Sequence, residues 1–313
     1  MGADLKSGAR PKISVVTPSF NQAPFLEETI RSVLLQNYPN LEFLIFDGGS
    51  TDGSVEVLRK YAPWLAYWTS AKDRGQTDAL NQGFRRATGE WIAWQNSDDF
   101  YAPGAFHAAA LAVTTAKDAG IFYGPITLCD MQGGQRSEAA IHPFEVNQLA
   151  RILFPLGNQS MFFHQGIFQA GHFLDESFHW CMDHEFFWRL WLAGIKFQFV
   201  PTMRGFYRQH DSAKSHAFAR RSSGELAAIC ERLLANPRLP APARQLAIRE
   251  LQDSCYQAFH HEEAAEYRAA CARLRKAAGQ DAITPGLAGR LAVAALGRPG
   301  IKFFRSIFGK GGS

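Results

Sequence analysis

Two adjacent carboxylates, Asp98 and Asp99, follow a short apolar run at 91–94 and are the clearest sign of chemistry in this sequence. The run is long enough for one buried strand, so the carboxylates fall where that strand meets a loop. Two partly buried, adjacent carboxylates raise the free energy of the folded state unless a positive charge lies next to them. A divalent cation with a phosphate-bearing ligand would supply that charge. The stretch 88–103 is therefore predicted to form a metal and phosphate site; the alternative is a charged turn that caps the next helix.

Similar polar loops follow three earlier runs whose apolar and β-branched residues are typical of buried strands. Strands are predicted at 13–17, 41–46 and 66–70, helices at about 25–37, 54–61 and 77–87, and polar loops at 17–22, 47–53, 73–76 and 96–99. This alternation favours a mostly parallel α/β sheet covered by helices on both faces. In such sheets ligands bind beyond the carboxyl ends of the strands, so we expect the four loops to form one crevice.

The rest of the chain is predicted to be less regular. A helix is expected at 104–119, followed by strands at 121–124, 126–129, 161–163 and 196–201 and by helices at 144–154 and 183–193. Beyond about 215 the composition becomes rich in Ala, Glu, Arg and Leu, which indicates two or three further helices. The predicted domains are a disordered N-terminus (1–12), an α/β domain (13–215), a helical appendage (216–280) and a basic amphipathic tail (281–313).

Composition restricts the function more weakly than the motifs do. The 313 residues are 46% apolar, enough for one large domain and an appendage, and the formal charge of +4 gives no reason to expect a nucleic-acid partner. The five Cys form no CxxC pair and read as free thiols in a reducing compartment. Because the first twelve residues are polar and no run approaches the roughly 20 apolar residues of a membrane span, a cytoplasmic protein is expected.

The last segment, 285–313, carries basic residues without a single acid. Within 301–308, aromatic and basic residues separate at helical spacing, as in a helix that lies on a membrane surface. Residues 285–310 are therefore expected to contact the cytoplasmic face of the membrane peripherally. The alternative is a helix that packs on the protein itself or on a partner.

Six segments, taken in order, resemble the family 2 glycosyltransferases, which are inverting, nucleotide-sugar-dependent enzymes with the Rossmann-like GT-A fold. They are VVTPSFNQ (15–22), DGGSTDGS (47–54), DRGQTDALNQGFRRATGEW (73–91), NSDD (96–99), MDHEFFWRLWLAG (182–194) and YRQHDSAKS (207–215). The resemblance covers about two-thirds of the chain. It implies a GT-A domain that takes a nucleotide-sugar donor.

The resemblance implies nucleotide contacts from the strand-end loops. Phe20 would lie near the opening of the base pocket, and Asp47 would accept the N3–H of uracil or thymine. Capping of helix 54–61 is the alternative for Asp47, and a structural role is equally open for Asn81. The complete predicted nucleotide-binding set is Thr17, Pro18, Ser19, Phe20, Asp47, Arg74, Asp78, Asn81, Asn96, Ser97 and Arg208.

The family's DxD-type metal motif corresponds to 96–98, with Asn96 where most relatives have Asp. Asp98 is the first choice as the ligand of Mn²⁺ or Mg²⁺ bridging the donor's diphosphate. Asp99 is expected to support that site from behind or to face the acceptor. His210 is a further candidate metal ligand; alternatively, Arg208 and His210 neutralise the leaving group.

The family's catalytic base corresponds to Asp183, at the start of helix 183–193. An inverting transfer needs one carboxylate to take the proton of the attacking acceptor hydroxyl. Glu185 is the alternative base, and Trp180 is a weaker candidate for stacking on an acceptor sugar. Where relatives usually have His-Gln, this chain has Asn158-Gln159.

The sequence therefore predicts an inverting glycosyltransferase that moves a sugar from a UDP- or dTDP-type donor to a saccharide or lipid-linked acceptor in bacterial surface polysaccharide synthesis. One alternative is a catalytically weak module that only binds nucleotide sugars, suggested by Asn96, Asn158 and Leu80. The other is a sugar nucleotidyltransferase. That class is expected to have a Gly-rich basic loop after the first strand, where this chain has Thr17-Pro18-Ser19-Phe20.

Overall fold

The computed structural model of this chain describes residues 10–308 except 135, 140, 142, 147–155, 212–213, 215–221 and 262. The described residues form two compact units. The first lies within 1–144 and 155–216, and the second within 145–154 and 217–313. Residues 1–9 of the predicted disordered N-terminus and most of the predicted helix 144–154 lie outside the described residues.

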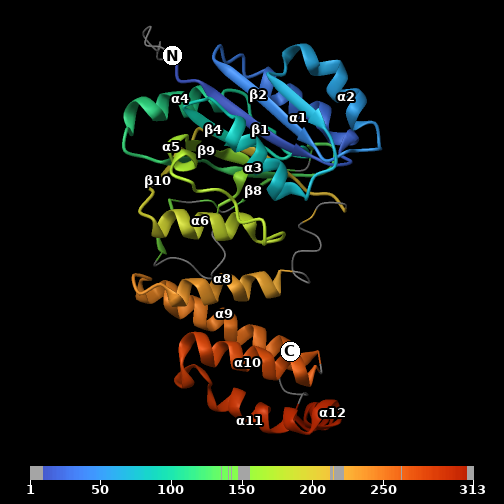
Figure 1. The fold of residues 1–313 in the computed structure, drawn as a ribbon, viewed down its shortest axis with the longest axis vertical. Coiled ribbons are helices and arrows are strands. Elements are labelled where there is room, and N and C mark those ends of the chain that lie inside the picture. Colours follow the sequence, from blue (N-terminus) through green and yellow to red (C-terminus); the bar gives the residue numbers. More distant parts are fainter. Residues whose placement is uncertain are drawn as a thin grey trace. The chain divides into compact units, whose positions relative to one another are not determined.

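A seven-stranded sheet forms the centre of the first unit (Figure 1). In spatial order its strands are β10 (Phe197–Phe199), β6 (Ile121–Tyr123), β9 (Met161–His164), β4 (Trp91–Trp94), β1 (Ile13–Ser19), β2 (Leu41–Asp47) and β3 (Tyr67–Ser70). The four strands β4, β1, β2 and β3 are parallel, whereas β9 runs antiparallel to both of its neighbours. The prediction of a mostly parallel sheet is confirmed.

Helices cover both faces of this sheet because its strands are apolar on both sides. Val15 of β1 belongs to a core cluster with residues of α1 (Ala23–Leu34), α2 (Ser54–Tyr61) and α4 (Ala105–Thr115). Val16 faces the other way: a Cβ on Gly83 of α3 (Gln76–Arg86) would lie 2.1 Å from its Cγ1. The rings of Phe168 in α5 (Gly166–Gln169) and Phe186 in α6 (Met182–Leu192) pack on the same side as α3, through Phe84 and Phe163.

A second, four-stranded sheet connects the end of the carboxylate motif to a distant part of the chain. Its order is β5 (Phe100–Tyr101), β11 (Gly205–Arg208), β7 (Ile126–Cys129) and β8 (Ser137–Glu138). Strand β5 pairs antiparallel with β11, Phe206 opposite Phe100, and the rings of these two residues stack at 4.5 Å. This small sheet brings residues 208–210 beside residues 98–100.

Most predicted elements of the first unit occur within a few residues of their expected places. Helix 54–61 matches α2 at both ends, whereas the helix expected at 104–119 ends at Thr115 and the strand expected at 196–201 is limited to 197–199. Between β9 and the small sheet lies one 3₁₀ turn, η3 (Asn158–Ser160), whose three residues are buried. The core cluster and η3 together hold the ends of β4 and β5 in place.

The second unit is helical. Its helices are α8 (Ser223–Ala235), α9 (Ala241–His260), α10 (Ala264–Ala278), α11 (Pro285–Ala295) and α12 (Gly297–Phe308). The Tyr267 hydroxyl of α10 donates to the Leu287 carbonyl of α11 at 2.7 Å. Ile301 of α12 is fully buried, and the Phe304 ring lies 5.9 Å from that of Phe259. The segment predicted as a tail therefore forms helices that pack within this unit.

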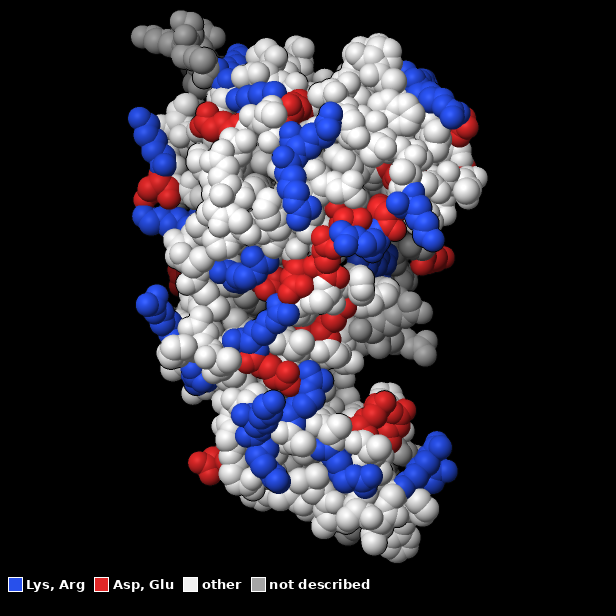
Figure 2. Space-filling view, in the orientation of Figure 1, with Lys and Arg blue, Asp and Glu red and all other residues white. Residues whose placement is uncertain are grey.

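Two further features concern the surface. In the described part of the chain, no helix is both long enough and apolar enough to cross a membrane. On the face drawn in Figure 2, Lys and Arg side chains are interspersed with Asp and Glu side chains. This mixture agrees with the small formal charge of +4.

Candidate functional site

The loops that follow β1 and β2 are joined by hydrogen bonds. Gly48 donates from its backbone N–H to the Ser19 carbonyl at 2.8 Å, and the Asn21 N–H donates to the Ser50 hydroxyl at 2.7 Å. Phe20, at the edge of the joined loops, is 59% exposed. The buried Thr17 and Ser19 hydroxyls have no hydrogen-bond partner among the described residues, so both remain available to a ligand or an ordered water.

Asp47 lies at the end of β2 and is almost completely buried. Its carboxylate accepts four hydrogen bonds: from the Gly49 and Ser50 N–H groups at 3.2 and 2.9 Å, and from the Ser50 and Ser70 hydroxyls at 2.5 and 2.6 Å. This carboxylate holds the loop 47–50 against β3. Its predicted contact with a nucleobase stays a prediction.

Arg74 follows β3 and forms a local ion-pair cluster. Its guanidinium lies 2.8 Å from the Asp78 carboxylate and 2.8 Å from Glu176, although 72% of its side chain is exposed. The hydrogen bond from Arg74 lowers the pKa of Asp78. The Asn81 amide is used structurally, since it exchanges hydrogen bonds with the Leu174 carbonyl and N–H at 2.9 and 3.0 Å. Arg74 is thus the member of this cluster that a phosphate could reach.

Asp98 and His210 are brought together, as expected for two ligands of one metal. The Oδ2 atom of Asp98 lies 3.2 Å from Nε2 of His210, and the Asp98 side chain is 20% exposed. The His210 ring packs against Phe25 at 4.5 Å, which fixes its orientation. The described residues contain no cluster of three or more His, Cys, Asp or Glu side chains able to hold a metal. A metal here would therefore take its remaining ligands from a diphosphate and water.

Asp99 has the opposite environment to its neighbour Asp98, because it is fully buried. Its Oδ1 accepts from the Arg208 N–H at 2.9 Å, and its Oδ2 accepts from the side-chain amides of Gln159 and Asn96 at 2.9 and 3.3 Å. Burial, together with the nearby charge of Asp98, raises the pKa of Asp99 well above its usual range. Asp99 joins β4, η3 and β11, so it positions the residues around the metal pair.

Arg208 is also fully buried, and its guanidinium is used within the protein. It donates to the Asp98 carbonyl at 2.9 Å, to the Met131 carbonyl and to the Glu28 carboxylate at 2.5 Å. The guanidinium lies 5.1 and 5.0 Å from the ring centroids of Phe25 and Phe100. Arg208 therefore braces the Asp98 backbone, and its predicted contact with the nucleotide stays a prediction.

Asn96 connects the metal pair to the start of α3. Its Oδ1 accepts from the Trp94 indole N–H at 2.9 Å and from the Gln76 amide at 3.0 Å. Gln76 in turn accepts from the Lys214 ammonium at 3.1 Å. Ser97 is buried, and its carbonyl accepts from Thr29 of α1. The Lys214 ammonium also lies 5.6 Å from the ring centroid of Trp180, the predicted stacking residue. That ring therefore lies beside the series of hydrogen bonds that links Lys214, Gln76 and Asn96.

The beginning of α6 is tied to the beginning of α3 because the Thr77 hydroxyl lies 2.8 Å from Sδ of Met182, and it also lies 3.1 Å from the Phe178 carbonyl just before that helix. Asp183, in the first turn of α6, is 27% exposed. Its Oδ1 accepts from the His184 N–H at 2.8 Å, and its Oδ2 has no partner in the described part of the chain. Glu185 is buried and binds Arg189 at 2.9 and 3.0 Å. Of the two candidate bases, Asp183 is the one with an open oxygen.

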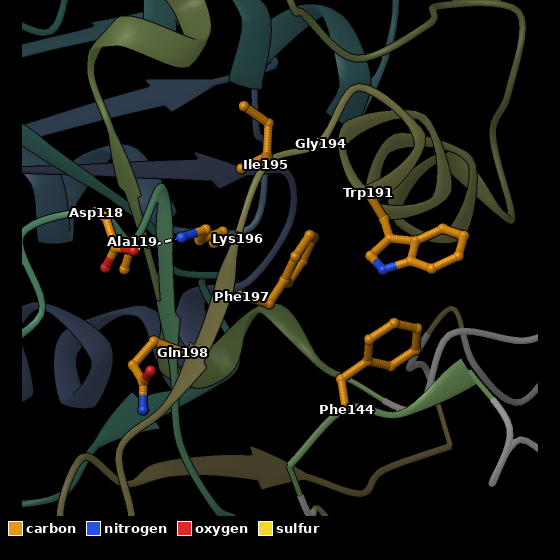
Figure 3. Close-up of a pocket in the computed structure, with 9 residues that line it drawn as sticks. All are labelled: Asp118, Ala119, Phe144, Trp191, Gly194, Ile195, Lys196, Phe197 and Gln198. Carbon is orange, nitrogen blue, oxygen red and sulfur yellow. Dashed lines mark hydrogen bonds and ion pairs between the residues drawn. The ribbon is translucent and has the colours of Figure 1, made fainter.

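A separate hollow of about 510 Å³ lies at the other end of α6 (Figure 3). The rings of Phe144, Trp191 and Phe197 face one another there, and an ion pair between Asp118 and Lys196 lies on the other side of β10. This hollow contains none of the predicted site residues.

Sequence reasoning missed several residues of the crevice. Gln76 and Lys214 bridge Asn96 to Trp180, Glu176 pairs with Arg74, and Gln159 supports Asp99. Gln159 follows Asn158, the residue at which this motif departs from the family, and the Asn158 amide nitrogen is buried without a partner among the described residues. Each of these four residues, Gln76, Lys214, Glu176 and Gln159, binds a side chain that is at least 20 residues away in the sequence.

Comparisons with known proteins identify the family of this chain. A family model described as glycosyl transferase family 2 matches residues 14–178, slightly more than half of the chain. An uncharacterized glycosyltransferase of Mycobacterium tuberculosis is 37% identical over 108 residues, which are 34% of this chain and 41% of that protein. The putative teichuronic acid biosynthesis glycosyltransferase TuaG of Bacillus subtilis is 36% identical over 95 residues, 29% and 37% of the two chains. The match thus spans about two fifths of these relatives.

Solved structures with the same fold cover nearly the whole chain. TarS of S. aureus in complex with UDP-GlcNAc has a TM-score of 0.71 at 16% identity and covers 94% of this chain and 92% of its own. The mannosyltransferase PcManGT from Pyrobaculum calidifontis, in complex with GDP-Man and Mn²⁺, has a TM-score of 0.58 at 19% identity, with 96% and 88% covered. At these identities the likeness concerns the fold. By the family model and this architecture, the chain belongs to glycosyl transferase family 2 and has the GT-A fold.

Proposed function

We propose that this protein is an inverting glycosyltransferase that moves a sugar from a UDP- or dTDP-type donor to a hydroxyl of a saccharide or lipid-linked acceptor. The observation that carries the proposal is the pairing of Asp98 with His210, 3.2 Å apart beside the carboxyl ends of the parallel strands. Ligand sites of parallel sheets lie at this edge. The family membership of the chain supplies the class of reaction.

The residues present fit a divalent metal. Asp98 and His210 offer one carboxylate oxygen and one imidazole nitrogen, and a donor diphosphate would complete the coordination. The nitrogen ligand favours Mn²⁺ over Mg²⁺, since Mg²⁺ prefers oxygen ligands. When bound, such a metal neutralises the charge that develops on the departing diphosphate. Arg208 and Asp99 contribute by holding the backbone on both sides of the pair.

Asp183 is proposed as the general base. It takes the proton of the acceptor hydroxyl while that oxygen attacks the anomeric carbon, and the bond from that carbon to the diphosphate oxygen breaks on the opposite face. Its carboxylate, 27% exposed, has one open oxygen among the described residues, whereas Glu185 is held by Arg189. Trp180, at the edge of the same region, is the proposed stacking surface for an acceptor sugar.

The relatives suggest the biological setting. One matching protein is named for teichuronic acid biosynthesis, and a structural neighbour binds UDP-GlcNAc. Synthesis of a bacterial surface polysaccharide is the proposed setting for this protein as well. A uridine or thymidine donor is proposed because the carboxylates at the end of β2 (Asp47) and in the loop after β3 (Asp73) are groups that accept a hydrogen bond from a base N–H.

Peripheral contact of residues 285–310 with an anionic membrane is proposed as a second property. Packing of α12 covers Ile301 and Phe304, but Phe303 remains 68% exposed beside the basic Lys302. An exposed aromatic ring next to cations suits an anionic lipid surface. Co-sedimentation with phosphatidylglycerol vesicles tests this: Phe303→Ser and Lys302→Glu should weaken binding, and unchanged binding by both would disprove it.

Donor turnover tests the proposed activity. With Mn²⁺ present, wild-type protein should slowly hydrolyse a UDP-sugar even without acceptor, and Asp98→Ala should lose this activity. A protein that only binds nucleotide sugars would show no metal-dependent hydrolysis. A nucleotidyltransferase would instead form a nucleotide sugar from a nucleoside triphosphate and a sugar phosphate, so the products distinguish the three classes.

A further inference from the structure

The buried carboxylate at the end of β2 has little remaining capacity for a ligand. Asp47 accepts hydrogen bonds from two backbone N–H groups and two hydroxyls, all within its own loop and β3. Three of these donors reach Oδ2 and the Ser50 hydroxyl reaches Oδ1. Because Asp47 is only 2% exposed, little of the carboxylate is accessible to a further donor. Moving one of these donors aside for a base would leave a buried polar group unpaired, which is costly.

A second carboxylate lies directly above the same loop. A Cβ added to Gly48 would lie 3.0 Å from Oδ2 and 3.2 Å from Oδ1 of Asp73, so the Asp73 carboxylate occupies the space that a side chain at position 48 would need. Its Oδ1 accepts from the Gly75 N–H at 2.8 Å. Its Oδ2 has no hydrogen-bond partner among the described residues, and Asp73 is only half-buried. One acceptor oxygen is therefore open at this point.

The strand order brings this oxygen to the loops that are predicted to form the base pocket. Strands β1, β2 and β3 are adjacent and parallel, so the loops that begin at Ser19, Asp47 and Ser70 leave the sheet at the same edge. The Gly48 N–H donates to the Ser19 carbonyl. The Asp73 carboxylate lies next to the Cα of Gly48, in the direction that a side chain there would take. The exposed ring of Phe20 is attached to the same loop pair. A planar base beside Phe20 would reach Gly48 and Asp73.

The chemistry of a carboxylate defines which bases it can accept. An ionised carboxylate only accepts hydrogen bonds, so it pairs with a ring N–H. Uracil, thymine and guanine present a ring N–H at their Watson–Crick edge, whereas cytosine and adenine present an acceptor nitrogen there. An acceptor facing an acceptor leaves both unpaired, which costs more than the lost bond itself.

We propose that Asp73, and not Asp47, is the residue that selects the donor nucleotide, and that it accepts the ring N–H of a uracil, thymine or guanine base. Gly48 also contributes to this selection, because the absence of a side chain there allows the Asp73 carboxylate to lie over the loop. Asp47 builds the floor of the pocket. This inference rests on the proposed function, since it assumes that a nucleoside diphosphate binds in the crevice.

The test is a titration of UDP, dTDP, GDP, CDP and ADP, with Mn²⁺ present, into wild-type protein and two variants. Wild-type protein should bind UDP at least about tenfold more tightly than CDP, as expected for a hydrogen bond to a charged group. Asp73→Asn should reduce this ratio about tenfold, because the amide N–H can donate to the cytosine ring nitrogen. Gly48→Ala should also reduce it, because the new methyl group displaces the carboxylate.

Neither variant is expected to unfold the protein. Asp73 is half-buried, and the three atoms nearest to a Cβ at Gly48 all belong to the end of that flexible side chain. Asp118→Asn, which changes another surface carboxylate of the first unit, is the matched control and should keep the wild-type ratio. A thermal melt of each variant verifies folding.

The outcomes separate this inference from the proposed function. If Asp73→Asn and Gly48→Ala keep the wild-type preference for UDP over CDP, the assignment of Asp73 is overturned while the proposed function stands. If wild-type protein binds no nucleoside diphosphate, the proposed function is overturned and the assignment falls with it. A smaller UDP-to-CDP ratio in both variants, with the control unchanged, supports the assignment.

Discussion

Two regions at the strand ends each contain a pair of carboxylates with contrasting surroundings: Asp47 with Asp73, after β2 and β3, and Asp98 with Asp99, after β4. In the first region Asp47 is buried with four donors, and Asp73 is half-buried with one open oxygen. In the second region Asp99 is buried with three donors, and Asp98 is 20% exposed beside His210. In both regions the carboxylate with many donors holds the loops together, and the other carboxylate is the one that we propose to bind a ligand.

The start of α6 shows the same contrast between two carboxylates. Glu185 is bound by Arg189, whereas Oδ2 of Asp183 has no hydrogen-bond partner among the described residues. The physical basis is the cost of burying a charge, which only a full set of donors offsets. Substitution of a saturated carboxylate should therefore reduce stability, and substitution of an open one should reduce binding or turnover. The predictions that follow test this division.

The largest effect is expected at α6. Asp183→Asn should lower the rate of sugar transfer by about 10²- to 10⁴-fold, the usual contribution of a general base, while the melting temperature and UDP affinity stay close to wild type. Glu185→Gln is the matched control. It loses the Arg189 ion pair, so it should melt at a lower temperature but retain most of its turnover once folded. A reversed pattern, with Glu185→Gln folded and inactive, would assign the base to Glu185.

Substitution of the two neighbouring carboxylates of the NSDD motif should lower the stability of the protein by different amounts. Asp99→Ala leaves the Arg208 N–H and the Gln159 and Asn96 amides without an acceptor in a buried place. We expect a loss of about 3 kcal/mol or more in the free energy of unfolding, measured by urea denaturation. Asp98→Ala removes one partly exposed contact and should change it by less than about 1 kcal/mol. Equal losses in the two variants would contradict the division.

A smaller effect is expected at Glu42, a saturated carboxylate outside the crevice that joins β2 to β1 and to the turn before β4. Burial raises the pKa of Glu42, but hydrogen bonds from Lys12, Ser14 and Thr88 outweigh it and lower the pKa to about 2. A pKa lower in the folded than in the unfolded state adds stability at higher pH that is lost as the pH falls. The loss is expected between about pH 4.5 and pH 2.

The variant Glu42→Gln tests this expectation. At pH 7 it should be less stable than wild type by about 2 kcal/mol, and the difference should shrink as the pH falls below about 4.5. Urea denaturation at pH 7, 5, 4 and 3 measures it. A stability difference that does not vary over this range would show that the ionised form of Glu42 is not the one stabilised.

Much of the fold could be predicted from the sequence, because the strands of the parallel sheet are continuous apolar runs. Helix α2 was predicted at both ends, and β1, β2 and β4 to within two residues. The small sheet was not predicted, since β5 and β8 have two residues each and form only through pairing with β7 and β11. Local patterns contain no information about such pairing.

The site could be predicted by location but not by residue role. The strand-end rule identified the loops with Asp47 and Asp98. It could not show which carboxylates are saturated, because the donors to Asp99 include Gln159, 60 residues away, and Arg208, 109 residues away. The guanidinium of Arg208, which the sequence predicts to contact the nucleotide, binds Glu28 and two carbonyls within the protein. Such long-range partners decide whether a charged side chain supports the fold or meets a ligand.

The central claim is that Asp98 and His210 hold a divalent metal together with a nucleoside diphosphate. Calorimetric titration of UDP with and without Mn²⁺ tests it most directly, since it requires no knowledge of the acceptor. We expect Mn²⁺ to tighten UDP binding at least about tenfold in the wild type, equivalent to about 1.4 kcal/mol of coupling. Asp98→Ala and His210→Ala, both folded by thermal melt, should lose most of this gain. Equal UDP affinity with and without Mn²⁺ in the wild type would contradict the claim.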